Sequence, residues 1–317
     1  MKRRRLTAPL LTLGLLVVAG CGSAATPTDE QETRTVRTLA GEVAVPTEVR
    51  RVVVVEGRRD LDVALALDLP VVGFPVEEDV ERFDLEAPLA AATQEARDAG
   101  AEELFLRGEI DLEAVAAAEP DLILGRAEDV EPVADQLAAI APTIPLGSVA
   151  DGGAWQDDLR LVAEATGREE RADEIVAAYD ARVADLRTTL AGRIDSVRVL
   201  PVDWSEEGTG VITTRLQSSV LRDLGARFAS SMATAEEAGG EQLFSPEQTD
   251  VAAQDADALL MVVDTPDEVA AAEADPLWAR LPAVRAGRVV RTDKFTHEGA
   301  SLTAMHVLDL AERLYAR

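Results

Sequence analysis

Apolar residues along the chain fall into two repeating patterns. Short β-branched runs such as Val52–Val55 are typical of strands buried on both faces of a sheet. They alternate with segments whose apolar residues recur every three or four positions, as in amphipathic helices. In the first half, the predicted strands are Val52–Val55, Val71–Phe74 (ended by Pro75), Leu122–Gly125 and Ile144–Leu146, and the predicted helices are Leu61–Leu67, Asp111–Glu119 and Val130–Ile140. This alternation predicts a mostly parallel sheet with helices on both faces.

A pair of predicted helices interrupts the alternation near the middle of the chain. Trp155–Thr166 has helical spacing and is followed by Gly167, which is typical of a helix end. A longer helix is predicted over Glu169–Ala191, with Gly192 as its C-terminal cap. At 1.5 Å per residue, this helix is expected to be roughly 34 Å long.

The alternation then resumes and echoes the first half. The predicted strands are Arg198–Val202, Val211–Thr213, Ala258–Val263 and Val289–Arg291, and the predicted helices are Gln217–Leu224 and Leu302–Tyr315. The segment Val115–Leu124 is also similar in sequence to Val251–Leu260. The chain is therefore predicted to be an α/β protein with two similar, Rossmann-like lobes.

The N-terminus has the pattern of a bacterial signal peptide. Met1–Arg5 is basic, and Leu6–Ala19 is an apolar stretch shorter than the roughly 20 residues needed to span a bilayer. Small residues precede the lone Cys21, so the segment resembles a lipobox. We expect residues 1–20 to be cleaved, Cys21 to be lipidated, and residues 21–40 to form a flexible tether. The alternative is an ordinary signal peptide with an incidental cysteine.

Composition narrows the classes of function. The chain has 317 residues, of which 47% are hydrophobic and 28% charged, a mix typical of a folded protein. Its net charge of −28 repels phosphate backbones, so we expect no nucleic-acid partner. One cysteine permits no intramolecular disulfide, and two histidines are too few for a three-histidine metal cage. We therefore expect no metal bound directly by the protein.

Several segments resemble one family, the substrate-binding lipoproteins of iron–siderophore ABC transporters, with their cobalamin- and haem-binding relatives. The segments are Gly41–Pro46, Asp60–Gly73, Asp111–Leu124, Ile140–Ile144, Phe244–Glu247 and Pro276–Val289. They follow the order of the family across residues 41–300. The resemblance implies two lobes, residues 41–150 and 193–317, joined by a helical connector at residues 151–192 with a single long helix.

The same resemblance implies a function and a location. The protein is expected to capture a ferric siderophore in a cleft between the lobes and to deliver it to an ABC permease for iron uptake. It is expected to be a monomer outside the cytoplasmic membrane, held there by its lipid anchor. The siderophore supplies the ligands of the iron, so no cofactor is implied.

Three alternatives remain at this point. Cobalamin or haem fits the same family, and His297 is a candidate axial ligand of haem. A protein for free zinc or manganese usually draws on several histidines, which this chain lacks. An extracytoplasmic enzyme needs a nucleophile and a base, but the sequence has no Gly-x-Ser-x-Gly, His-Glu-x-x-His or Walker A motif. We therefore do not expect an enzyme.

Candidate ligand-binding residues follow the predicted strands, because parallel α/β sheets bind ligands beyond the carboxyl ends of their strands. The candidates are Arg58, Arg59, Phe74, Arg126, Trp204, Arg215, Lys294 and His297. Guanidinium groups can bond the oxygen-rich, often anionic face of a ferric siderophore, and aromatic rings can pack on its organic rim. The alternatives are a solvated surface charge for each arginine and core packing for Trp204.

Two glutamates are candidates for docking to the permease. In the resembling family, one surface glutamate on each lobe meets basic residues of the permease, and Glu113 and Glu247 match these positions. About two extra residues separate Glu247 from the next predicted strand, which departs from the family's spacing. The alternative for both is an acidic residue that favours a helix N-terminus.

Overall fold

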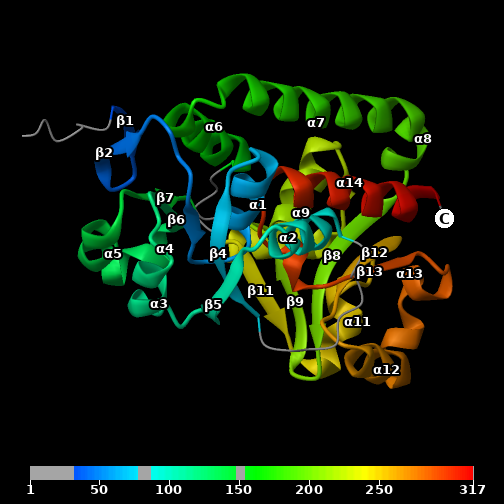
Figure 1. The fold of residues 1–317 in the computed structure, drawn as a ribbon. Helices are drawn as coiled ribbons and strands as arrows, with labels where there is room; N and C mark the ends of the chain where they lie inside the picture. Colours follow the sequence, from blue (N-terminus) through cyan, green and yellow to red (C-terminus); the bar gives the residue numbers. More distant parts are fainter. Residues whose placement is uncertain (1–31, 78–86, 148–153, 317) are drawn as a thin grey trace, which may run out of the picture. The chain divides into compact units, whose positions relative to one another are not determined.

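The computed structural model describes residues 32–77, 87–147 and 154–316 (Figure 1). The predicted signal peptide and Cys21 lie outside the described residues. Of the helices within these three ranges, none combines the length and the apolar character that crossing a membrane requires.

The described chain begins with a β-hairpin. Strands β1 (Thr33–Thr38) and β2 (Gly41–Pro46) pair antiparallel. Each strand has a buried valine, Val36 and Val45, which both belong to the first hydrophobic core. The prediction of a flexible tether through residue 40 was therefore wrong from Thr33 onward, because this segment buries apolar surface and hydrogen-bonds to a partner strand.

The first sheet has five parallel strands in the order β5-β4-β3-β6-β7. They are β3 (Val52–Val54), β4 (Val71–Val76), β5 (Glu102–Leu106), β6 (Leu122–Arg126) and β7 (Thr143–Leu146). The helices between them are α1 (Arg59–Ala66), α2 (Pro88–Asp98), α3 (Leu112–Ala117), α4 (Ala127–Val130) and α5 (Ala134–Ile140), with the 3-10 turn η1 (Glu131–Val133) between the last two. Strands β3, β4, β6 and β7 confirm the prediction, whereas α2 and β5 were not predicted.

Two prolines explain where the prediction for this half differs in detail. Strand β4 continues through Pro75 because its register with β5 shifts between Phe74 and Val76, at the residue that has no N–H. The predicted helix Val130–Ile140 is instead broken into α4, η1 and α5. Pro132 lies at the start of η1, where its missing N–H is tolerated.

The chain passes from the first sheet to the second through three helices. These are α6 (Trp155–Thr166), α7 (Glu169–Thr189) and the short α8 (Ala191–Ile194). Gly167 ends α6 with φ of +70°, as predicted. The predicted cap at Gly192 was wrong, because α7 ends at Thr189 with Leu190 as its cap, and Gly192 lies inside α8.

The second sheet has the order β11-β9-β8-β12-β13, with β10 also pairing with β8. Its strands are β8 (Arg198–Ser205), β9 (Gly208–Ile212), β10 (Arg227–Phe228), β11 (Glu241–Phe244), β12 (Ala258–Val262) and β13 (Val289–Thr292). Strands β8, β12 and β13 are parallel, whereas β9 is antiparallel to both β8 and β11. Four of these strands were predicted; β10 and β11 were not.

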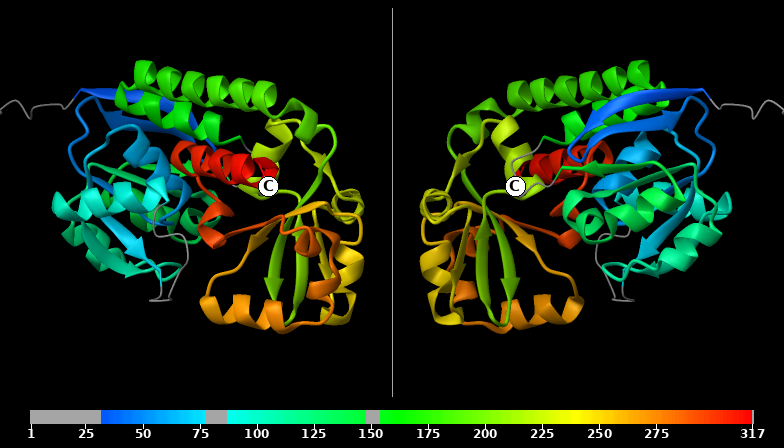
Figure 2. Two further views of the ribbon diagram at one scale, coloured as in Figure 1. Left: turned by 90° about the vertical axis from the view of Figure 1, so that its right-hand side faces the viewer. Right: turned by 90° about the vertical axis from the view of Figure 1, so that its left-hand side faces the viewer.

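The helices of the second half cover this sheet and reach back to the first. They are α9 (Leu216–Asp223), α10 (Ser230–Glu237), α11 (Thr249–Ala252), α12 (Pro266–Ala274), α13 (Pro282–Arg285) and α14 (Ser301–Ala316), with 3-10 turns η2 (Pro246–Gln248), η3 (Trp278–Arg280) and η4 (Lys294–Thr296). Helix α14 packs on α1, α7 and α9, and Figure 2 shows it in red beneath the green α7. Two α/β lobes, each with its own sheet, are thus joined by α7, as predicted.

Candidate functional site

Charged side chains gather where the carboxyl ends of the first sheet's strands meet residues 293–298, which follow β13. We call this group the strand-end cluster. Its basic members are Arg58, Arg107, Arg126, Arg215 and Lys294, and its acidic members are Glu56, Glu77, Glu128, Asp129, Asp264 and Glu298. Every basic member forms an ion pair with at least one acidic member. Both lobes contribute to the cluster.

The turn after β3 places its first members. The Asp60 carboxylate accepts the backbone N–H groups of residues 55–57 at 2.7 to 2.9 Å. Gly57 has φ of +91°, and a Cβ atom there would lie 2.7 Å from Pro75 Cγ, so the turn requires glycine. The turn carries Arg58 to the edge of the sheet with its orientation fixed.

Arg58 connects the first lobe to the second. Its Nη2 lies 2.7 Å from Glu77 Oε1, and its Nη1 donates a hydrogen bond of 3.2 Å to the Lys294 carbonyl. Its guanidinium carbon also lies 5.2 Å from the centroid of the Phe295 ring, within the range of a cation–π contact. Lys294 Nζ lies 3.5 Å from Asp264 and 4.0 Å from Glu77. Both basic residues were predicted site residues, and the structure brings them together.

Arg107 is a member of the cluster that the sequence did not reveal. It follows β5 directly, and its Nε donates a hydrogen bond of 3.1 Å to Glu56 Oε1. Glu56 Oε2 accepts the N–H groups of Arg58 and Arg59 at 2.9 and 3.0 Å. Burial alone would raise the pKa of the Glu56 carboxyl, but Arg107 and Arg58 hold that pKa below its usual value. Candidate residues were sought directly after predicted strands, so Arg107 would have been a candidate if β5 had been predicted.

Glu298 joins the two remaining arginines. Its Oε1 accepts a hydrogen bond of 2.9 Å from Nη1 of Arg126, the last residue of β6, and lies 4.0 Å from Arg215 Nη1. Arg126 Nε also pairs with Asp129 at 2.9 Å. Burial lowers the pKa of the Arg126 guanidinium, but Glu298 and Asp129 raise it above its usual value, so Arg126 keeps its charge. The candidates predicted from the sequence were basic or aromatic residues that follow strands. Glu298, an acidic residue six positions after β13, was therefore not among them.

Arg215 belongs to the cluster, but the structural reason for its position differs from the predicted one. The prediction placed it after a strand parallel to the others, but β9 runs antiparallel to β8. The Leu216 N–H donates a hydrogen bond of 2.9 Å to the His297 carbonyl, which ties the start of α9 to the segment after β13. Arg215 therefore lies beside Glu298 because of this contact between loops.

His297 lies at the edge of the cluster. Its Nε2 is 3.1 Å from Asp203 Oδ1 on β8, and its side chain is largely buried. Within residues 32–77, 87–147 and 154–316, no group of three or more His, Cys, Asp or Glu side chains is arranged to hold a metal ion.

Arg59 lies outside the cluster, and its predicted role in ligand binding is not what its position indicates. Only 1% of the residue is exposed. Its Nη1 lies 2.9 Å from Asp158 Oδ2 on α6, and the guanidinium also donates to the carbonyls of Gly147 and Gly299. These contacts connect α1 to three other parts of the chain, so Arg59 stabilises the fold.

The two predicted aromatic contacts are also buried. Trp204 is 7% exposed and belongs to the hydrophobic core of the second lobe, which is the core-packing alternative stated above. Phe74 is 1% exposed and belongs to the first core. Trp204 is therefore held by core packing, whereas Phe74 also lines the pocket described next, so its contact with a ligand stays a prediction.

An apolar pocket of about 560 Å³ adjoins the strand-end cluster. It shares Glu77 with the cluster, and it includes Phe295, which lies against the Arg58 guanidinium. The other apolar side chains that line it include Leu61, Phe74, Pro75, Leu89 and Leu106. Charged groups and an apolar surface thus lie side by side, as an amphipathic ligand requires.

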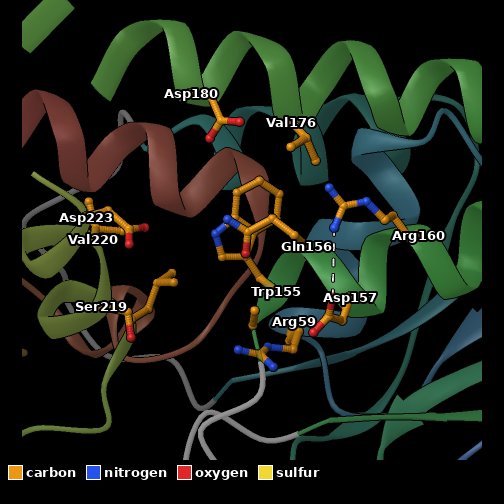
Figure 3. A pocket seen from close by; sticks show the side chains of 12 residues that line it. Arg59, Trp155, Gln156, Asp157, Arg160, Val176, Asp180, Ser219, Val220 and Asp223 are labelled. Carbon is orange, nitrogen blue, oxygen red and sulfur yellow. Dashed lines mark ion pairs between the residues drawn. The ribbon is translucent and has the colours of Figure 1, made fainter. Parts of the chain in front are cut away.

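A second pocket, of about 420 Å³, lies among α6, α7 and α9 (Figure 3). Figure 3 shows the Trp155 ring in it, with Asp180 on the α7 side and the Asp157–Arg160 pair of 3.8 Å at its edge. Of the predicted site residues, it includes Arg59 alone. No member of the strand-end cluster is among the described residues that line it.

The two predicted docking glutamates are exposed at helix starts. Glu113 lies in the first turn of α3, where the Asp111 side chain accepts the N–H groups of Glu113 and Ala114. Glu247 lies in η2, and its own backbone N–H together with Ser245 lowers the pKa of its carboxyl. Both sites are accessible to a partner, and the docking role stays a prediction.

The sequence and the fold are similar to those of known proteins. The sequence profile described as "Periplasmic binding protein" matches residues 93–295, more than half of the chain. The chain is 28% identical to the "Probable siderophore-binding lipoprotein YfiY" of Bacillus subtilis over 229 residues, which are 69% of this chain and 70% of that protein.

Two solved structures share the fold. The triscatecholate siderophore binding protein FeuA from Bacillus subtilis, complexed with ferri-bacillibactin, matches with a TM-score of 0.73 at 19% identity, over 89% of this chain and 98% of that one. The siderophore periplasmic binding protein from the fuscachelin gene cluster of Thermobifida fusca matches with a TM-score of 0.66 at 26% identity, over 86% and 98%.

Proposed function

Because this chain belongs to the periplasmic binding protein family, we propose that it captures a ferric siderophore and delivers it to an ABC permease for iron uptake. The names of YfiY and of the two structural neighbours, all siderophore-binding proteins, support this proposal. The family is one of substrate-binding transport proteins, and we assign no enzyme activity. The iron is cargo, held by the siderophore's own oxygen atoms.

The strand-end cluster is the observation that carries the proposal. Arg58 and Arg126 come from the first lobe, whereas Arg215 and Lys294 come from the second. Guanidinium and ammonium groups bind the oxygen atoms of a siderophore by charge-assisted hydrogen bonds. The adjoining pocket supplies apolar surface for the organic part of the ligand.

The location and the partners belong to the same proposal. Lipidation at Cys21 anchors the mature chain, as a monomer, outside the cytoplasmic membrane. Glu113 on the first lobe and Glu247 on the second meet basic residues of the permease. The positions of both glutamates at the surface support this docking.

A ligand titration tests the proposed function. The mature chain is purified and titrated with ferric tris-hydroxamate, ferric tris-catecholate, ferric citrate, cobalamin and haem, with tryptophan fluorescence and calorimetry as readouts. We expect saturable 1:1 binding of at least one ferric siderophore. Binding of cobalamin or haem alone would instead assign the protein to that branch of the family, and binding of none of the five would overturn the proposal.

A further inference from the structure

The strand-end cluster has no excess of positive formal charge, and this charge balance limits which ligands can bind there. Its five basic side chains face six carboxylates, and each basic side chain is already paired. The chain as a whole has a net charge of −28. A ligand that retains net negative charge therefore meets no excess of positive charge here, and it is repelled at longer range.

Glu298 is the carboxylate on which this balance depends most directly. It is 6% exposed, and it lies between Arg126 of the first lobe and Arg215 of the second. A buried charge interacts more strongly with neighbouring charges than a solvated charge does, because the local dielectric constant is lower. Glu298 thus supplies the two arginines with the negative charge that an anionic ligand would otherwise supply.

Two polar atoms at this contact have unused bonding capacity. Among the described residues, Glu298 Oε2 accepts no hydrogen bond and Arg215 Nε donates none, although both atoms are buried. Buried polar atoms without partners are costly, so a ligand that supplies both a donor and an acceptor is favoured. An amide group has this combination, because it carries an N–H beside a carbonyl oxygen, whereas a hydroxamate bound to iron is ionised and has no O–H to donate.

We infer that Glu298 makes the site select ferric siderophores without net negative charge, the tris-hydroxamate class, over ferric tris-catecholates and ferric citrate. This inference rests on the proposed function. Three hydroxamates balance the charge of ferric iron, whereas three doubly ionised catecholates exceed it. An anionic complex must either displace Glu298 from Arg126 or lie beside its carboxylate, and both cost affinity. Specificity then arises from repulsion of the wrong ligand as much as from attraction of the right one.

The test compares two probes on three proteins. The probes are ferrichrome, a neutral ferric tris-hydroxamate, and ferri-bacillibactin, an anionic ferric tris-catecholate. The proteins are the mature wild type, Glu298→Gln, and Glu131→Gln, which makes the same charge change at an exposed position in η1. Thermal unfolding confirms that each variant is folded, and Kd is measured by fluorescence titration at two salt concentrations.

We expect the wild type to bind ferrichrome at least about tenfold more tightly than ferri-bacillibactin. Glu298→Gln should tighten ferri-bacillibactin binding by about tenfold, while ferrichrome and the control variant change by less than about threefold. A wild type that prefers ferri-bacillibactin, or a Glu298→Gln variant that binds it no more tightly, overturns the inference but leaves the proposed function intact. If Glu298→Gln does not fold, the inference is still tested by whether the wild type prefers ferrichrome or ferri-bacillibactin. Absence of binding to both probes and to ferric citrate overturns the proposed function, and this inference with it.

Discussion

Asp62 on α1 caps α14 through Thr303, 241 positions later in the chain. Asp62 Oδ2 accepts both the N–H of Thr303 at 2.9 Å and its hydroxyl at 2.7 Å. The same carboxylate accepts the N–H groups of Ala300 and Leu302 at 2.9 and 3.0 Å. The first turn of the last helix thus receives its hydrogen-bond acceptors from the first lobe, at a site where Asp62 is fully buried.

We expect Asp62→Ala to lower the free energy of unfolding by at least about 3 kcal/mol, because it leaves several buried N–H groups without an acceptor. The measurement is urea denaturation. Asp173→Ala, at an exposed position on α7, is the control and should change stability by less than about 0.5 kcal/mol. Equal effects of the two substitutions would show that the cap does not stabilise the fold.

Asp60 should give the protein a specific pH dependence. Burial and the neighbouring Glu56 carboxylate raise the pKa of Asp60 from its ordinary value of 3.8 to about 7. Between pH 3.8 and 7, Asp60 holds a proton in the folded chain that it has lost in the unfolded chain. The contribution of Asp60 to the free energy of unfolding therefore falls as the pH rises through this range, and it no longer changes above pH 7. The difference in unfolding free energy between wild type and Asp60→Asn should follow that course, measured by urea denaturation from pH 4.5 to 8.5. A difference that stays constant or rises with pH would contradict the assignment.

The buried pair of Arg59 and Asp158 should matter for folding and not for ligand contact. Arg59→Ala leaves Asp158 buried without its cation and should cost about 3 to 5 kcal/mol of stability. The double variant Arg59→Met/Asp158→Leu should be less destabilised than Arg59→Ala, because no charge remains unpaired. Folded Arg59→Ala, assayed in the cold, should bind the ligand within about threefold of wild type. A selective loss of affinity would restore Arg59 to the ligand site.

Arg126, in contrast to Arg59, should be important for ligand binding. Arg126→Ala removes a guanidinium of the strand-end cluster and should weaken ferric-siderophore binding by about tenfold or more, because a charge-assisted hydrogen bond is worth roughly 1.5 to 3 kcal/mol. Arg160→Ala, beside the second pocket, makes the same charge change and should leave Kd unchanged. The reverse result in parallel titrations would place the ligand in the pocket of Figure 3.

Lipidation at Cys21 can be tested in cells. Cys21→Ser removes the thiol that accepts the lipid, so the mature chain should lose its membrane attachment and appear in the soluble extracytoplasmic fraction. Fractionation and mass spectrometry of the N-terminal peptide measure this change. Retention of the variant on membranes to the same extent as wild type would mean that another feature anchors the chain.

The sequence alone determined the elements whose signals are local. Val52–Val54 of β3 is a run of β-branched residues, and α7 repeats its apolar residues every three or four positions, so both are evident without their neighbours. Arg58, Arg126 and Lys294 were then predicted as site residues, because ligands bind beyond the carboxyl ends of parallel strands and each of the three follows a predicted strand. Strand β5 gave no such signal, since it lies at the edge of the sheet with Glu102 and Glu103 exposed, and Arg107 was lost with it.

Only the tertiary structure decided which side chains meet. Arg58 and Arg59 are adjacent in sequence and chemically identical, yet one pairs with Glu77 in the strand-end cluster and the other with Asp158 on α6. Arg126 and Glu298 are 172 positions apart and meet only because both lobes present loops to the same place. Ion pairs depend on distances of a few ångströms between segments remote in sequence, and periodicity carries no information about those distances. The residue types at the ends of the strands were therefore predictable, whereas the charge balance of the site was not.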